Sequence, residues 1–330
     1  MQLTLVLPSL LSLPPATLAA SSALAGLVQR APAPRHETAG IDAVLLAVAR
    51  QPPGTPLAPL AARGAGVACG NDVIARADPV ALIAGRDDVL LGGRVDDLAG
   101  ADAQAFVERL NTHFAHDGLV FAAPRPDTWF VHLRGLDPPQ TTSLAQVHGA
   151  IHAHLPRGAQ SGQWKRWLSE MQMLLHDDPR NAARERDGRV PVTAIWIADA
   201  GTMGGAGGDA STQWFAPAGR EGDVARGLAV QDPASAATPP AGFAHLPPAR
   251  DAVVILPALR TPAALDAAAA AWLAPALAAL DRRTLAALTV VATDGRHAFV
   301  WTPRAAPWWT RWQPWSRPGA FVPPTALEPR

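Results

Sequence analysis

The 330-residue chain has very little cysteine, lysine and tyrosine: one cysteine, one lysine and no tyrosine. The single cysteine, Cys69, excludes an intramolecular disulfide and a zinc site built on cysteines. The surrounding stretch GVACGND supplies no base that would activate a thiol nucleophile. We therefore expect a packed or idle thiol, in a protein whose cysteine usage agrees with a reducing cytoplasm.

Net charge is also absent, because 28 basic residues balance 28 acidic ones. The chain thus has no global field that would attract nucleic acid or an anionic membrane, and we expect neither as a partner. The apolar N-terminus has no lysine or arginine before Arg30 and is interrupted by Pro8, Pro14 and Pro15, which does not fit a signal peptide. No run of 18 apolar residues occurs elsewhere, so we expect no membrane-spanning helix and a cytoplasmic location.

Hydrophobic residues make up 48% of the sequence, enough for a sizeable core. Segments with strand and helix patterns alternate along the chain, which predicts a mixed or parallel sheet covered by helices. We expect one α/β domain over residues 1–330, mobile loops near 201–222 and 231–250, and a tryptophan-rich C-terminal arm at 303–330. The expected strands include 3–7, 120–123, 128–133, 192–197, 288–292 and 297–302, and the expected helices include 16–29, 41–50, 101–116, 145–154, 164–176 and 262–280.

The segment from Glu170 to Trp196 combines a helix, a proline-marked break, an arginine-rich helix and a strand. Large apolar side chains recur at helical spacing before the break, which predicts a core-facing stripe: Trp164, Trp167, Leu168, Met171, Leu174 and Leu175. Asp178 followed by Pro179 is typical of an N-cap and a first helical residue. The second helix is therefore expected to begin there and to end near Gly188.

Two polar residues of that second helix, Asn181 and Arg184, lie three apart and share a face. A guanidinium and an amide in this arrangement can recognise a phosphate or a carboxylate. The alternative is that Arg184 and Arg186 pair with Asp187 and Glu185 on a solvated face. Asp177 and Asp178 also oppose an anion at the helix N-terminus, because they compete for the positive end of its dipole.

The whole segment, EMQMLLHDDPRNAARERDGRVPVTAIWIADAG, resembles the signature of the regulatory protein RpfE type family. Further stretches resemble the same family in the same order, among them DPVALIAGRDDVLL, AFVERLNTHFAHDGLVF, PRPDTWFVHL and TTSLAQVHGAIHAHLPRG. That family is in turn similar to cofactor-independent phosphoglycerate mutases of the archaeal type, which have an alkaline-phosphatase-like fold. The resemblance implies a doubly wound mixed sheet covered by helices and a ligand site for a phosphate ester, with His176, Asn181 and Arg184 in the matching positions.

The sequence departs from the mutases where their two metal ions would be held by Asp and His at strand ends. Pro8 and Ser9 follow the first strand in place of an Asp-Gly pair, and Asp294 and Gly295 follow a late strand in place of Asp-His. Thr193 also replaces a second Asn of the motif. We therefore predict no metal site and no cofactor on a scaffold that is degenerate relative to the mutases.

The function expected from these observations is a noncatalytic regulatory or binding protein of bacterial type, with a phosphorylated small molecule or a protein as its partner. The alternative is a metal-dependent, phosphoglycerate-mutase-like phosphotransferase that uses divalent metal ions. No residue is predicted to be catalytic. The histidines His148 and His152, four apart, lack a third metal ligand nearby in the sequence.

The C-terminal tryptophans alternate with arginines, a pattern that can stack single-stranded nucleic acid. The neutral charge balance disfavours that use. We expect an arm packed on the domain, with a protein-docking surface as the alternative.

Overall fold

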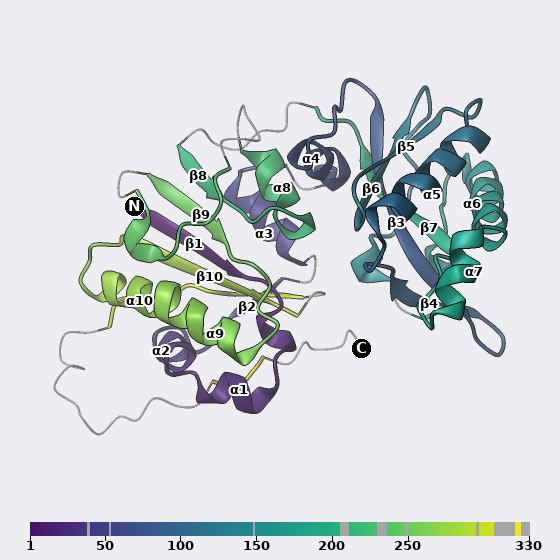
Figure 1. Ribbon diagram of the computed structural model, residues 1–330. Helices are drawn as coiled ribbons and strands as arrows, with labels where there is room; N and C mark the ends of the chain where they lie inside the picture. The colour runs from purple at the N-terminus through teal and green to yellow at the C-terminus, as the bar shows by residue number, and fades with distance from the viewer. Residues whose placement is uncertain are drawn as a thin grey trace. The chain divides into compact units, whose positions relative to one another are not determined.

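A computed structural model describes residues 1–37, 40–52, 54–147, 149–204, 211–229, 236–247, 250–294, 297–306 and 321–324. The chain divides into two compact units, residues 1–53 with 207–330 (unit 1) and residues 54–206 (unit 2) (Figure 1). Each unit has its own sheet and its own hydrophobic core. From the sequence we expected one domain over residues 1–330; along the chain, unit 2 lies between the two stretches that form unit 1.

Unit 1 is built on a mixed six-stranded sheet with the order β2-β11-β10-β1-β9-β8. The central strands β10, β1, β9 and β8 run parallel, whereas β11 runs antiparallel to both β10 and β2. The expected mixed sheet is thus present, and β10 and β11 are neighbouring antiparallel strands in it. The strands are β1 (Gln2–Leu7), β2 (Arg35–Glu37), β8 (Thr212–Phe215), β9 (Asp251–Ile255), β10 (Ala287–Thr293) and β11 (Ala298–Trp301).

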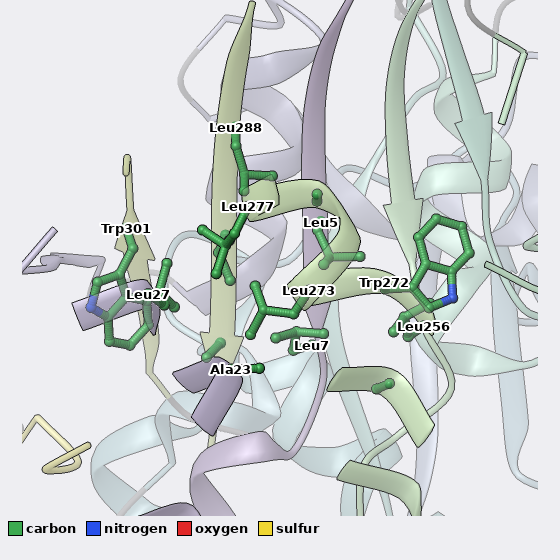
Figure 2. Close-up of a cluster of buried hydrophobic side chains, with 14 of the residues drawn as sticks. Leu5, Leu7, Ala23, Leu27, Leu256, Trp272, Leu273, Leu277, Leu288 and Trp301 are labelled. Atoms are coloured by element: carbon green, nitrogen blue, oxygen red, sulfur yellow. The ribbon is translucent and has the colours of Figure 1, made fainter. Parts of the chain in front are cut away.

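Helices contact this sheet on both faces (Figure 1). Alternate residues of the central strands, such as Leu5, Leu7 and Leu288, face the main core. There they meet α2 and the helix over Pro262–Asp281 (Figure 2). The opposite face carries α3 and α8. The helices are α1 (Pro15–Ala20), α2 (Ser22–Arg30), α3 (Gly40–Val48), α8 (Arg220–Leu228), α9 (Pro262–Ala268) and α10 (Ala274–Asp281), with short turns η1 (Leu10–Ser12) and η5 (Phe243–His245).

The helix over Pro262–Asp281 is continuous through a π-helical turn, η6 (Ala269–Leu273), which joins α9 to α10. Pro275, which has no N–H to donate to the preceding turn, follows closely after this π turn. By length and composition this 20-residue helix could cross a membrane, and it is the one such helix among the described residues. Its apolar residues, including Trp272, Leu273 and Leu277, pack in the core of unit 1.

Unit 2 contains a five-stranded antiparallel sheet, in which β3 pairs with β4 and β6 and also with β7, while β5 pairs with β6. The strands are β3 (Val73–Ala84), β4 (Val89–Arg94), β5 (Leu119–Arg125), β6 (Thr128–Leu133) and β7 (Ala194–Gly201). The helices are α4 (Leu57–Gly64), α5 (Gly100–His113), α6 (Ser161–His176) and α7 (Pro179–Arg186), with 3-10 turns η2 (Leu144–Gln146) and η3 (Ile151–His154).

The main core of unit 2 lies between the sheet and helices α5 and α6, where Phe106, Trp129 and Trp164 are almost fully buried. The opposite face of the sheet has a smaller core, in which Val147 and Ile151 of the segment around η2 and η3 cover Trp196. The segment from Glu170 to Trp196 joins these two cores, because α6 belongs to the first and β7 contributes to both.

Several sequence expectations about local structure were wrong. The helix expected over 16–29 is two helices, because Ser21 leaves helical geometry and caps α2 through a bond from the Leu24 N–H. The helix expected over 145–154 is two 3-10 turns, since Gly149 adopts a left-handed φ of 69° between them.

The regions expected as loops and as an arm are only partly described. The range 201–222 contains strand β8 and the start of α8, and the range 231–250 contains η5. Of the expected arm, the structure describes 303–306 and 321–324, where Phe321 is buried against Trp301. Four of its tryptophans, at positions 308, 309, 312 and 315, lie outside the described residues.

Candidate functional site

The apolar stripe of α6 is confirmed as a core-facing surface. Trp164, Trp167, Met171 and Leu175 are buried, while Met173 on the other side of the helix is exposed. The break after α6 also forms as expected. Asp178 is the N-cap of α7 and accepts a bond from the Arg180 N–H. The Asp178 carboxylate, which is fully buried, also pairs with the guanidinium groups of Arg109 at 3.3 Å and Arg180 at 3.0 Å.

Asn181 is 4% exposed, and its side-chain amide bonds to the backbone on both sides of α7. Its Nδ2 donates to the carbonyls of Leu175 and Val192, each at 2.7 Å, and its Oδ1 accepts from the Val192 N–H at 2.9 Å. The amide therefore joins the end of α6 to the segment that enters β7. Both its donor and its acceptor functions are engaged inside the protein.

Arg184 is 1% exposed and lies on the same face of α7. Its Nε donates to the Val190 carbonyl at 2.8 Å, and its Nη2 pairs with the carboxylate of Asp97, whose side chain is 57% exposed. The third nitrogen, Nη1, is buried and has no hydrogen-bond partner among the described residues. Arg184 thus pairs with neither of the acidic neighbours on its own helix; the partner is a residue distant in the sequence.

His176, the last residue of α6, is exposed, whereas Asn181 and Arg184 are buried. Thr193, which replaces a second Asn of the motif, hydrogen-bonds strand β3: its N–H donates to Val80 and its Oγ1 accepts from the Leu82 N–H at 2.6 Å. The hydrogen bonds of Asn181, Arg184 and Thr193 thus connect different elements of unit 2.

Strands β3 and β7 also carry a buried charged cluster, which the sequence did not predict. Arg76 of β3 is 7% exposed and pairs with Asp199 of β7 at 3.5 Å. Asp199 also accepts a bond from Ser143 and has a left-handed φ of 58°, at a point where the register of β3 and β7 shifts. The available signal was an acidic residue at the end of an otherwise apolar strand. Bulges of this kind are frequent next to binding sites.

The carboxyl ends of β1 and β10 are where open α/β sheets usually bind ligands. Ser9, the second residue after β1, has a left-handed φ of 58°, and its N–H donates to Thr293 Oγ1 at 3.1 Å. The Asp294 carboxylate contacts His297 Nδ1 at 3.1 Å and accepts from the His297 N–H at 2.7 Å. The His36 ring lies 5.3 Å from that of His297, and its Nε2 is buried without a partner among the described residues.

These residues do not fit the two-metal site of a mutase. Pro8 offers no side-chain ligand, and in the part of the chain that the structure describes no group of three or more His, Cys, Asp or Glu side chains is placed to hold a metal ion. His152 is exposed and lies 3.6 Å from Asp88, while His148 lies outside the described residues.

Cys69 is half-buried, and its thiol donates toward the carbonyls of Val67 and Pro59. Burial raises the pKa of the Cys69 thiol, and the charge of Arg63 and a hydrogen bond from its backbone oppose this only in part. A thiol with a raised pKa is a poor nucleophile at neutral pH.

A pocket of about 580 Å³ in unit 1 is lined by three arginines, Arg30, Arg35 and Arg304. We call it the arginine pocket. It lies between α3 and the sheet, and the hydroxyl-bearing residues Thr289 and Thr302 also line it. None of the described residues that line it is acidic.

Two of these arginines have acidic partners outside the lining. Arg30 pairs with Asp281 through two bonds, of 3.2 and 2.6 Å, and Arg35 pairs with Glu37 at 3.0 Å. Arg304 is exposed and forms no ion pair among the described residues. The local balance in the pocket is therefore positive.

Comparisons with known proteins give similarities of structure only. The chain is similar to a cofactor-independent phosphoglycerate mutase from Thermoplasma acidophilum DSM 1728, with 13% identity, a TM-score of 0.43, and coverage of 92% of this chain and 89% of that one. It is also similar to the PH0037 protein from Pyrococcus horikoshii, with 14% identity, a TM-score of 0.49, and coverage of 92% and 87%. No family model and no curated protein matches the chain. Membership of the regulatory protein RpfE type family stays a prediction.

Proposed function

We propose that this protein is a noncatalytic binding protein with a regulatory role in the cytoplasm, and that its ligand is a small phosphorylated metabolite. The ligand site that we propose is the arginine pocket of unit 1. The observation that carries the proposal is the guanidinium of Arg304, which has no acidic partner among the described residues and lies beside two further arginines in a pocket without acidic lining.

The chemistry of the pocket suits a phosphate monoester. Guanidinium groups bind phosphate oxygens through paired, charge-assisted hydrogen bonds. Arg30 uses three of its five N–H donors on Asp281 and the Gly26 carbonyl, which fixes its orientation and leaves two donors. The hydroxyls of Thr289 and Thr302 add neutral donors, and Val44 and Val48 of α3 add an apolar wall for a carbon skeleton.

The residues that the resemblance pointed to are not part of this proposal. Asn181 engages its amide with the backbone, and Arg184 is buried against Asp97. Binding there would require these bonds to break, and each buried group released would have to be satisfied by the ligand. The arginine pocket requires no such rearrangement.

The test is isothermal titration calorimetry of the full chain with 3-phosphoglycerate and with inorganic phosphate, using uncharged glycerol as the negative control. Arg304→Gln should raise the Kd for the phosphorylated ligand by about tenfold or more, because it removes a charge-assisted hydrogen bond. Arg282→Gln, an exposed arginine of the same unit outside the pocket, is the matched control and should leave the Kd unchanged. Equal effects of the two substitutions, or no binding at millimolar ligand, would contradict the proposal.

A mutase assay with added manganese addresses the alternative function. Turnover that a chelator abolishes would replace the noncatalytic proposal with a metal-dependent phosphotransferase. The same assay on Arg184→Ala would then show whether the segment identified from the sequence takes part in that activity.

A further inference from the structure

We infer that unit 2 carries a second ligand site, independent of the arginine pocket, in a closed loop formed by residues 140–157, and that it takes a small molecule bearing a carboxylate or phosphate group. The loop is closed at its base, where Gln140 and Arg157 form an antiparallel bridge and the Arg157 N–H donates to the Gln140 carbonyl at 3.0 Å. Compact loops whose ends meet in this way are often functional.

The loop lines an open pocket of about 540 Å³, within the range of small-molecule sites. Its polar lining consists of hydrogen-bond donors: the guanidinium of Arg157, the imidazole of His154, the hydroxyls of Thr141 and Thr142, and the amide of Gln140. None of the described residues that line it is acidic. A site with one guanidinium, several neutral donors and no carboxylate favours a small oxyanion with adjacent hydroxyl groups.

The loop is held firmly against the sheet, which pre-organises the pocket. Trp196 Nε1 donates to the Thr142 carbonyl at 2.9 Å, and the next residue, Ser143, donates to the carboxylate of Asp199. Val147 and Ile151 anchor the middle of the loop in the smaller core. The pocket wall at Thr141 and Thr142 is therefore fixed from behind before any ligand binds.

The anchor behind this wall is the strained part of the sheet. Asp199 has a left-handed backbone near the end of β7, and its carboxylate pairs with the buried guanidinium of Arg76. An unfavourable backbone conformation at a buried ion pair is typical of a position that the protein maintains for a binding site. Here its result is to hold Ser143 and thereby the two threonines.

On the pocket side, Arg157 is exposed, and its Nη2 donates to the Ala153 carbonyl at 2.5 Å. This bond orients the guanidinium and leaves its other donors for a ligand. His154 Nδ1 lies 3.4 Å from Thr142 Oγ1, so that the ring and the hydroxyl belong to the same donor group. Arg157 thus contributes an exposed cationic side chain to the lining of the pocket.

The experiment is hydrogen exchange of the full chain, read by mass spectrometry, with three probes: glycerate, glycerol phosphate and uncharged glycerol. Glycerate separates a carboxylate ligand from the phosphate of glycerol phosphate. We expect at least one of the two anions, and not glycerol, to slow exchange in residues 140–157. Arg157→Gln should raise the Kd for that anion, measured by calorimetry, by about tenfold or more.

Two controls make the result specific. Arg134→Gln, an exposed arginine of unit 2 outside the pocket, should leave the affinity unchanged, and Thr142→Val should weaken it if Arg157→Gln affects folding. Arg304→Gln should leave the protection of residues 140–157 intact, which separates this site from the arginine pocket. Absence of protection with both anions at millimolar concentration, or equal affinity losses in Arg157→Gln and Arg134→Gln, would overturn the inference.

Discussion

Replacing Asn181 by alanine tests whether this residue is a structural link. The substitution removes three hydrogen bonds of 2.7, 2.7 and 2.9 Å and leaves both backbone groups of Val192 without their side-chain partner. A buried hydrogen bond contributes about 1 kcal/mol net, so the free energy of unfolding should fall by ~3 kcal/mol. Because Asn181 is almost fully buried, water cannot replace the lost bonds without opening the junction of α6, α7 and β7.

Asn181→Asp makes the test sharper. An aspartate can still accept from the Val192 N–H, but its second oxygen would face the carbonyl oxygens of Leu175 and Val192, where the native amide donates. We therefore expect the aspartate to destabilise the protein more than the alanine does. Arg186→Ala is the matched control, since its guanidinium bonds only within α7 and is exposed; its effect should stay within about 0.5 kcal/mol.

The assay is urea unfolding followed by circular dichroism, combined with hydrogen exchange at the amide of Val192. In Asn181→Ala that amide should exchange faster than in the native protein. If Asn181→Ala unfolds within about 0.5 kcal/mol of the native protein, the structural reasoning is refuted. In that case the side-chain amide of Asn181 in the native protein would be available to bind a ligand, as the sequence resemblance implies.

Two further predictions concern buried charge and the thiol. Asp97→Ala should cost ~3 kcal/mol because it leaves the buried guanidinium of Arg184 unpaired, whereas Arg184→Met should cost less, because removing the charge also removes its desolvation; the reverse order in urea unfolding would contradict this. Cys69 should react with a neutral-pH alkylating reagent more slowly than an exposed thiol, and its rate should rise only above the ordinary thiol range, since burial raises its pKa. A rate at neutral pH equal to that of a free thiol would show that Cys69 is not held as described.

The same raised pKa fixes the sign of a pH effect. The folded state favours the neutral thiol of Cys69, so its contribution to stability is present below the thiol pKa of the unfolded chain and is lost as the pH rises through the folded-state pKa. Removing the thiol by Cys69→Ala should therefore reduce the loss of stability at alkaline pH. Thermal melts of both proteins at neutral and alkaline pH would measure that difference.

Local structure near Glu170–Trp196 was predictable because its signals are local. The spacing of Trp164, Trp167 and Met171 defines a helical stripe, and Asp178 with Pro179 defines the next helix start, whatever the rest of the chain does. The helix expected over 145–154 failed for a tertiary reason. Val147 and Ile151 turn toward the core below Trp196, and Gly149 allows the turn between them.

The roles of the candidate site residues were not predictable from the sequence. Asn181 and Arg184 have the chemistry of a phosphate site, and only the positions of Val192 and Asp97 show that the Asn181 amide and the Nη2 of Arg184 are engaged inside the protein. Buried polar groups must find partners, and the partner can come from any element that the fold brings near. The sequence does not say which.

The sequence by itself determined the composition of the chain, its lack of net charge, the single thiol and most helices and strands, because these depend on residues close together in the chain. The tertiary structure decided the division into two units and the grouping of Arg30, Arg35 and Arg304 in one pocket. It also decided the closure of the loop over residues 140–157. The physical reason is that strand pairing and burial join distant segments, so a binding site becomes visible only when the sheet has placed its residues side by side.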